Sequence, residues 1–87
     1  MTTTTAFDWS AVAPAWDAHR GGVQRETSPV AAALHAGLAL REGERVLELG
    51  SGTGDHARTL AELVGTSGSL LATDVAQGMV DLTAATL

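Results

Sequence analysis

The 87-residue sequence contains no cysteine and no lysine. Without cysteine, the chain has no disulfide framework and no thiolate ligand for a metal ion. This composition suits a reducing compartment, and we expect a cytoplasmic protein. The three histidines stand singly along the chain, and no pair of them has the spacing of metal ligands, so no metal site is expected.

Positive charge is also scarce. Five scattered arginines stand against ten acidic residues, which gives a formal net charge of -5. Nucleic acids and anionic membranes bind through clustered cations, so neither is an expected partner. The longest apolar runs are far shorter than the roughly 20 residues of a membrane span, and the N-terminal residues lack the basic and apolar regions of a signal peptide. A soluble chain is therefore expected.

The N-terminal half predicts helices. Residues 1–6, with four consecutive threonines, are expected to form a disordered lead. Residues 7–44 are expected to form helices. The first helix is predicted to have Ser10 as its cap and to carry Trp9 and Trp16 on one face, because these residues follow helical spacing.

A polar connector with a glycine pair is expected over residues 19–28. Its last residue, Ser28, precedes Pro29, and this pair predicts the cap and first residue of a second helix over residues 29–40. Gly43 is the expected C-cap of that helix. The apolar residues of the helix that are expected to face inward are Val30, Ala33, Leu34 and Leu38.

Residues 45–87 predict a βαβ unit. The segments "RVLELG" (45–50) and "SLLATDV" (69–75) are apolar enough to be parallel strands covered on both faces. Between them, residues 55–64 predict a helix that is stopped by Gly65, and another helix begins after residue 76. The inward residues of the helix between the strands are expected to be Ala57, Leu60, Ala61 and Val64. The predicted fold class is α/β, with a Rossmann-like βαβ unit preceded by helices.

Three glycines, Gly50, Gly52 and Gly54, lie where the first strand ends and the next helix begins. Such a turn brings backbone N–H groups close to a ligand. The second strand ends at Asp74, 20 residues after Gly54, where an acid accepts hydrogen bonds from the hydroxyls of a ribose. The combination indicates a ligand that contains a nucleoside.

The charges around the turn argue against a phosphate. Asp55 stands where the dinucleotide fingerprint has its last glycine, so it would face a pyrophosphate, and Glu48 precedes the first glycine by two residues. A carboxylate about 6 Å from a phosphate costs on the order of 3 kcal/mol at an effective dielectric constant of about 20. NAD, FAD and ATP are therefore disfavoured, and a nucleoside with positive charge is favoured.

The segment "VLELGSGTG" is similar to the first motif of class I methyltransferases that use S-adenosylmethionine (SAM), and "LLATDVAQGMV" resembles their second motif. The upstream "FDWSAVAPAWDAHR" resembles the N-terminal helix of the small-molecule branch typified by quinone-biosynthesis enzymes. The resemblance covers residues 7–87. It implies SAM as the cofactor, a small-molecule methyl acceptor, and a seven-stranded domain of which residues 45–87 form an incomplete SAM-binding part.

The resemblance also implies roles for individual residues. Those implied to lie around the methionine end of SAM are Glu48, Gly50, Ser51, Gly52, Thr53 and Gly54. Asp74 would hold the ribose hydroxyls, Val75 and Met79 would lie against the adenine, and Trp16 would cover the cofactor. No residue is assigned a catalytic role. Ala76 replaces a serine that is frequent in the family, which removes a helix cap and no ligand contact.

Each of these residues also has a purely structural interpretation. The glycine turn can be a tight connection without a ligand, and Glu48 can pair with Arg45 or Arg58. Asp74 can cap the last helix, which is compatible with a ribose contact. Met79 can be a core residue, and the two tryptophans can form a packing stripe rather than a lid.

A functional alternative concerns His19, which could act as a catalytic base.

Two parallel strands leave their edges uncovered. We therefore expect either a fragment of a larger enzyme or a chain that completes its sheet by forming a homo-oligomer. A non-enzymatic βαβ module that binds adenosine compounds weakly or not at all is the competing hypothesis, and the chain alone is expected to be inactive.

Overall fold

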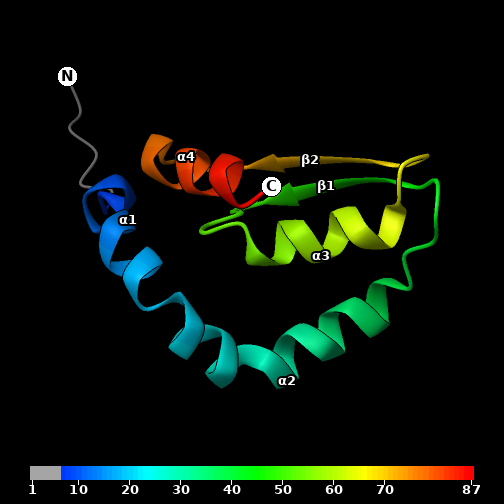
Figure 1. The fold of residues 1–87 in the computed structure, drawn as a ribbon, viewed down its shortest axis with the longest axis horizontal. Helices are drawn as coiled ribbons and strands as arrows, with labels where there is room; N and C mark the ends of the chain where they lie inside the picture. Colours follow the sequence, from blue (N-terminus) through cyan, green and yellow to red (C-terminus); the bar gives the residue numbers. More distant parts are fainter. Residues whose placement is uncertain (1–6) are drawn as a thin grey trace.

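The computed structural model describes residues 7–87, and the expected disordered lead at residues 1–6 lies outside them. Four helices and two strands follow one another along these residues (Figure 1). In order they are α1 (Trp9–Ala18), α2 (Arg20–Leu38), β1 (Arg45–Leu49), α3 (Asp55–Val64), β2 (Ser69–Thr73) and α4 (Gln77–Thr86). The chain is thus a mixed α/β structure, as the sequence predicts.

β1 and β2 pair in parallel, with Val46 opposite Leu70 and Glu48 opposite Ala72. α3 connects the two strands and packs against both of them. Residues 45–73 therefore form the predicted βαβ unit, in which both strands end at the same side of the sheet. Seven strands remain a prediction for a larger protein, since residues 7–87 contain a two-stranded sheet.

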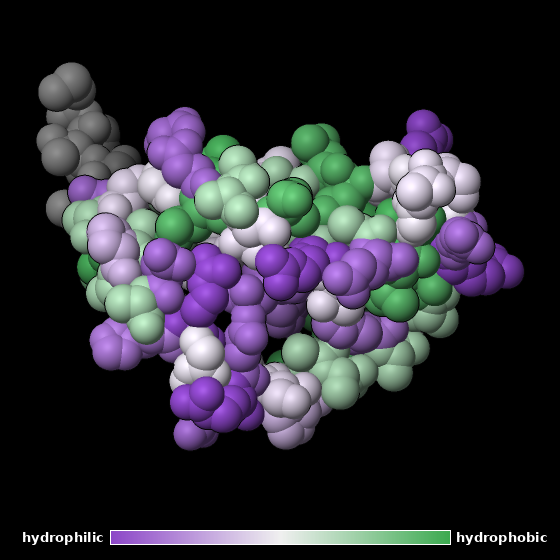
Figure 2. All heavy atoms as spheres, viewed as in Figure 1, coloured by the Kyte–Doolittle hydropathy of each residue, from purple (hydrophilic) through white to green (hydrophobic). Residues whose placement is uncertain are grey.

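One face of this sheet is bare within residues 7–87. Leu47 and Leu71 lie opposite each other in the two strands and are 58% and 64% exposed, and Leu49 is 78% exposed. Figure 2 shows hydrophobic residues along the upper side of the molecule in this view, where the two strands run in Figure 1. The expectation that both faces of the sheet are covered is wrong for the described residues. α3 covers one face, and no described element covers the leucines on the opposite face.

α3 forms as predicted. Ala57, Leu60 and Val64 recur at helical spacing and are buried, while Ala61 is partly buried. The helix begins after Gly54 and ends at Gly65, and both glycines have positive φ angles, of 89° and 67°.

The N-cap of α1 lies two residues before the predicted one. Asp8, and not Ser10, is the N-cap, and its carboxylate accepts a hydrogen bond from the Ala11 N–H at 3.2 Å. Ser10 instead lies against α4, where its hydroxyl oxygen accepts a hydrogen bond from the Gly78 N–H at 3.0 Å. Ala76 is the N-cap of α4 and has no side chain that could accept such a bond. Ser10 of α1 therefore provides an acceptor for one of the free N–H groups at the start of α4.

α2 differs most from expectation. The helix runs from Arg20 through the predicted connector, so Pro29 lies inside it, and Ser28 is not its cap. It ends at Leu38 with Ala39 in the left-handed conformation, so Gly43 is not the C-cap. The Gly43 N–H instead donates to the Val64 carbonyl at 2.8 Å, which joins the following loop to α3.

The apolar side of α2 is also not inward-facing. Val30, Leu34 and Leu38 are 69%, 49% and 45% exposed, and the helix has no buried residue. α2 follows an arc beneath α3 in Figure 1. Among residues 7–87, no helix is long and apolar enough to cross a membrane.

Candidate functional site

The glycine turn requires glycine at three positions. Gly50, Gly52 and Gly54 have φ angles of 78°, 58° and 89°, a region in which a side chain is strained. The N–H groups of Gly50 and Ser51 both donate to the Thr73 carbonyl, at 2.9 and 2.8 Å. The end of β2 therefore fixes the start of the turn.

α4 supports the turn from the side, through two threonines that the sequence analysis missed. Thr83 is buried, its hydroxyl donates to the Gly52 carbonyl at 2.9 Å, and its oxygen lies 2.8 Å from the Ser51 hydroxyl. Thr86 lies one turn further along and its hydroxyl is 2.7 Å from the Thr53 carbonyl. Threonines three residues apart share a helix face, which is the signal that could have suggested them.

Asp74 braces the turn with both carboxylate oxygens. Oδ2 accepts a hydrogen bond from the Gly52 N–H and Oδ1 accepts one from the Ala76 N–H, each at 3.0 Å. The interpretation of Asp74 as the cap of the last helix is wrong, because the N-cap of α4 is Ala76 and no side-chain hydrogen bond caps this helix. Each oxygen has a second lone pair, so a ribose contact at the same carboxylate stays a prediction.

A cavity of about 470 Å³ opens at the carboxyl ends of the strands. Its volume lies in the range of about 300 to 1,000 Å³ that is usual for small-molecule sites. The predicted site residues that line it are Trp16, Glu48, Gly50, Ser51, Gly52, Thr53, Asp74, Val75 and Met79. Gly54 does not line it, because this glycine is buried against α4.

Further residues of the wall were not predicted as site residues: Trp9, Val23, Gln24, Thr27, Asp55 and His56. Three of them come from α2, whose first half the sequence analysis took for a connector. The wall therefore combines the two helices before β1 with the glycine turn and the residues after β2.

Glu48 is the least satisfied group in this wall. Its Oε1 is buried and has no hydrogen-bond partner within residues 7–87, and no ion pair to Arg45 or Arg58 forms among those residues. Burial raises the pKa of Glu48, and the charge of His56 opposes that rise. A buried carboxylate oxygen beside a cavity can bind a cationic group that enters it.

Asp55, in contrast, is already compensated. Its carboxylate accepts a hydrogen bond from the Thr53 hydroxyl at 2.6 Å and forms an ion pair with Arg20 at 3.4 Å. Burial alone would raise the pKa of Asp55, but hydrogen bonds from Thr53 and Gln24 and nearby arginine charges outweigh it and lower the pKa. The argument against a phosphate ligand therefore rests on Glu48 more than on Asp55.

The lowered pKa of Asp55 makes stability depend on pH. Its folded pKa lies below the ordinary value of 3.8, so its stabilising contribution is present above that value and is lost as pH falls through the folded pKa. Asp55→Asn is expected to lower the free energy of unfolding by about 1 kcal/mol at pH 7 and by progressively less below pH 3.8. Urea titrations across this range measure both effects, with Glu62→Gln, an exposed acid of the same helix, as control. A pH-independent difference would contradict the assignment.

The two tryptophans of α1 lie together, with ring centroids 6.3 Å apart, and both line the cavity. Trp9 and Trp16 are 41% and 40% exposed. They form a packing stripe and a cavity wall at once. Met79 is likewise both a core residue, packed with Ala13 and Ala76, and part of the wall.

The histidines do not form a metal centre. The rings of His35 and His56 are 5.4 Å apart in an edge-to-face arrangement, and residues 7–87 contain no group of three side chains that could hold a metal ion. His19 lies exposed between α1 and α2 and is not among the residues that line the cavity.

The chain is thus a mixed α/β protein with a cavity beside a glycine turn. One protein family, described as "Protein of unknown function (DUF938)", matches residues 18–87. This match takes in most of the chain, and the chain belongs to that family.

Short parts of curated methyltransferases are also similar. Protein-L-isoaspartate O-methyltransferase 1 of Archaeoglobus fulgidus is 54% identical over 37 residues, which are 42% of this chain and 17% of that protein. Protein-L-isoaspartate O-methyltransferase of Methanothrix thermoacetophila is 47% identical over 45 residues, 52% of this chain and 21% of that protein. The chain spans about a fifth of the length of these relatives. No solved structure matches it.

Proposed function

We propose that this chain is the cofactor-binding part of a SAM-dependent methyltransferase. The observation that carries the proposal is the buried Oε1 of Glu48, which has no partner within residues 7–87 and lies beside a cavity that Asp74 also lines. SAM has an ammonium group that can pair with Glu48 and ribose hydroxyls that can donate hydrogen bonds to Asp74. The short similarity to named methyltransferases supports the same reaction class.

In this proposal each residue has a defined task. Glu48 binds the ammonium of the methionine end, while the glycine turn excludes side chains from the space that the cofactor occupies. Asp74 accepts hydrogen bonds from the ribose hydroxyls, and Val75, Met79 and Trp16 provide apolar surface for the adenine. Bound SAM supplies an activated methyl group, so the protein's main task is to align the acceptor.

The finer features of the proposal concern the whole protein. Residues 45–87 belong to a seven-stranded class I domain, residues 7–44 form its cap, and the acceptor is a small molecule as in the quinone-biosynthesis branch. The protein is cytoplasmic. The similar methyltransferases are named for protein L-isoaspartate, so isoaspartyl peptides belong in the same acceptor screen as small molecules.

The first experiment is calorimetric titration of the purified protein with SAM, with its demethylated product S-adenosylhomocysteine, and with NAD. Binding of the first two and not of NAD supports the proposal. Binding of NAD in preference to SAM would instead support a nucleotide-dependent oxidoreductase, which the uncompensated charge of Glu48 disfavours.

A second experiment tests the ribose contact of Asp74. Asp74→Ala is expected to weaken adenosine binding about tenfold and to lower the free energy of unfolding by about 1 to 2 kcal/mol, because two backbone N–H groups lose their acceptor. Titration with adenosine and with 2′,3′-dideoxyadenosine separates the two roles. The parent should prefer adenosine, and the variant should not. An unchanged preference would remove Asp74 from the ribose site and leave it as a brace of the turn.

A homo-oligomeric βαβ module is the second candidate, and the exposed leucines of the sheet favour it. Leu47, Leu49 and Leu71 form an apolar face that a second copy would cover. Light scattering on the same sample gives the molecular mass. An oligomer that binds no adenosine compound would support this candidate over the methyltransferase, and a monomer that binds SAM would exclude it.

A further inference from the structure

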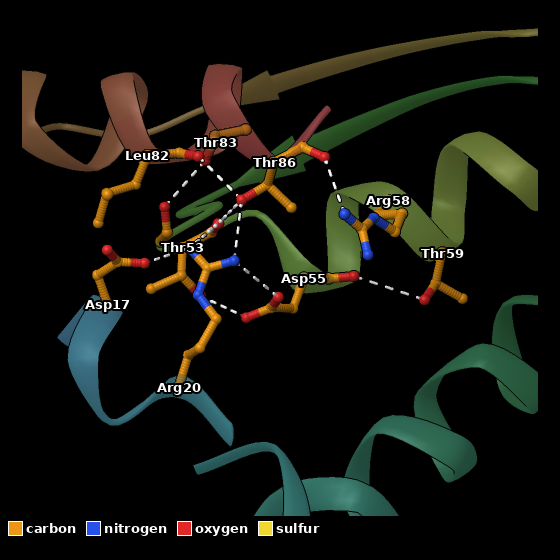
Figure 3. Close-up of polar contacts among 10 residues, drawn as sticks. Asp17, Arg20, Thr53, Asp55, Arg58, Thr59, Leu82, Thr83 and Thr86 are labelled. Carbon is orange, nitrogen blue, oxygen red and sulfur yellow. Dashed lines mark hydrogen bonds and ion pairs between the residues drawn. The ribbon is translucent and has the colours of Figure 1, made fainter. Parts of the chain in front are cut away.

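Arg20, the first residue of α2, connects four parts of the chain (Figure 3). Its guanidinium forms an ion pair with Asp17 of α1 at 2.7 Å and with Asp55 of α3 at 3.4 Å. It also donates to the Thr53 carbonyl of the glycine turn at 3.4 Å and to the Thr86 hydroxyl of α4 at 3.1 Å. The planar guanidinium can serve all these acceptors because its donors point in fixed, different directions.

These bonds matter because α2 has no buried residue of its own. α1 is held on α4 nearer its N-terminus, through Ala13 and the hydrogen bond of Ser10 with the Gly78 N–H. Figure 2 shows hydrophilic residues gathered where α1 and α2 meet the rest of the molecule. The junction of the two helices is therefore fastened to the glycine turn by charged hydrogen bonds rather than by apolar burial.

Arg20 does not line the cavity, but three of its four partners line it or follow a residue that does. Thr53 and Asp55 are part of the wall, and Asp17 follows Trp16 directly. A change at Arg20 would therefore act on the cavity through these neighbours. Arg20 therefore contacts both the tryptophan side of the cavity, through Asp17, and the glycine side, through Thr53 and Asp55.

We propose that Arg20 is a positioning residue, which ties the Trp16 end of α1 to the glycine turn and so sets the width of the cofactor cavity. The identity of the ligand, SAM, rests on the proposed function. The link that Arg20 makes between α1 and the glycine turn does not depend on it. Without Arg20, the carboxylates of Asp17 and Asp55 lose their shared cation and α1 moves more freely away from the turn.

The test compares Arg20→Met, which keeps an unbranched apolar stem and removes the guanidinium, with Arg25→Met. Arg25 lies in the same helix, is exposed, and makes no ion pair within residues 7–87. Arg20→Met is expected to weaken SAM binding about five- to tenfold in calorimetry, with the far-ultraviolet circular dichroism unchanged. Arg25→Met is expected to leave the affinity unchanged.

Two readouts need no ligand. Acrylamide should quench the fluorescence of Trp9 and Trp16 more strongly in Arg20→Met than in the parent, and amide hydrogen exchange should rise in α1 and the glycine turn while β1 and β2 keep their protection. Equal quenching and exchange in a folded Arg20→Met protein would overturn the proposal. If the parent fails to bind SAM, the proposed function fails, and these readouts still decide the role of Arg20.

Asp17→Asn provides a second variant in case Arg20→Met does not fold. It weakens only the bond between Arg20 and α1, and the bonds to the turn remain. Quenching of the tryptophans is expected to rise by a smaller amount than in Arg20→Met. No change in quenching or in exchange of α1 amides would count against the positioning role.

Discussion

Glu48→Gln is expected to make the protein more stable and to weaken its binding of SAM about a hundredfold. The free energy of unfolding should rise by about 1 kcal/mol, because the buried Oε1 has no partner within residues 7–87 and an amide is easier to bury than a carboxylate. Binding should weaken because the ammonium of SAM loses its counter-charge, a loss of about 2 to 3 kcal/mol. Urea titration and calorimetry measure the two effects.

The gain in stability should also depend on pH. Burial raises the folded pKa of Glu48 above its ordinary value of 4.5. The protonated side chain therefore favours the folded state at pH values below 4.5, and this contribution to stability is lost as pH rises through the folded pKa. The advantage of Glu48→Gln should therefore be largest at neutral pH, shrink as pH falls through the folded pKa, and be absent well below pH 4.5. Glu62→Gln, at an exposed position, should show neither effect. A destabilised Glu48→Gln protein that binds SAM normally would contradict both the burial penalty and the ammonium site.

The βαβ unit was predictable because its signals are local. The apolar segments of β1 and β2 read as strands, and the spacing of Ala57, Leu60 and Val64 marks the buried side of α3. Parallel strands end at the same edge of a sheet, which is why the sequence could place Glu48 and Asp74 beside one cavity. These inferences need the order of the elements and no knowledge of distant contacts.

α2 was mispredicted for the opposite reason. A serine followed by a proline is a local signal for the start of a helix, and it places the start of α2 at residues 28–29. The helix instead begins at Arg20, whose side chain bonds to Asp55 and to Thr53, more than 30 residues away. The apolar spacing of Val30 and Leu34 predicts a buried side only if another element lies against it, and none does within residues 7–87. The supporting role of Arg20 likewise arises from tertiary contacts that no local pattern indicates, while for Thr83 the only local signal is its spacing from Thr86.

Gly54→Ala is expected to have the largest effect on stability, a loss on the order of 3 to 5 kcal/mol in the free energy of unfolding. Two costs combine at this position. With φ at 89°, an alanine is strained, and its Cβ would lie 2.8 Å from the Cα of Thr83 and 3.1 Å from the Cβ of Thr86. Relief of the clash requires α4 to move away from the turn, which breaks the bonds between Thr83 and the Gly52 carbonyl. Thermal and urea unfolding measure the loss.

Gly50→Ala separates strain from clash and tests the cavity at the same time. Gly50 has a φ angle of 78°, close to that of Gly54, but a Cβ there would meet no atom within 4 Å. It should therefore cost about 1 to 2 kcal/mol, the strain alone. Gly50 lines the cavity, so the added methyl group should weaken SAM binding in a protein that still folds. Equal destabilisation by the two alanines would show that strain dominates and that the contact between Gly54 and α4 contributes little.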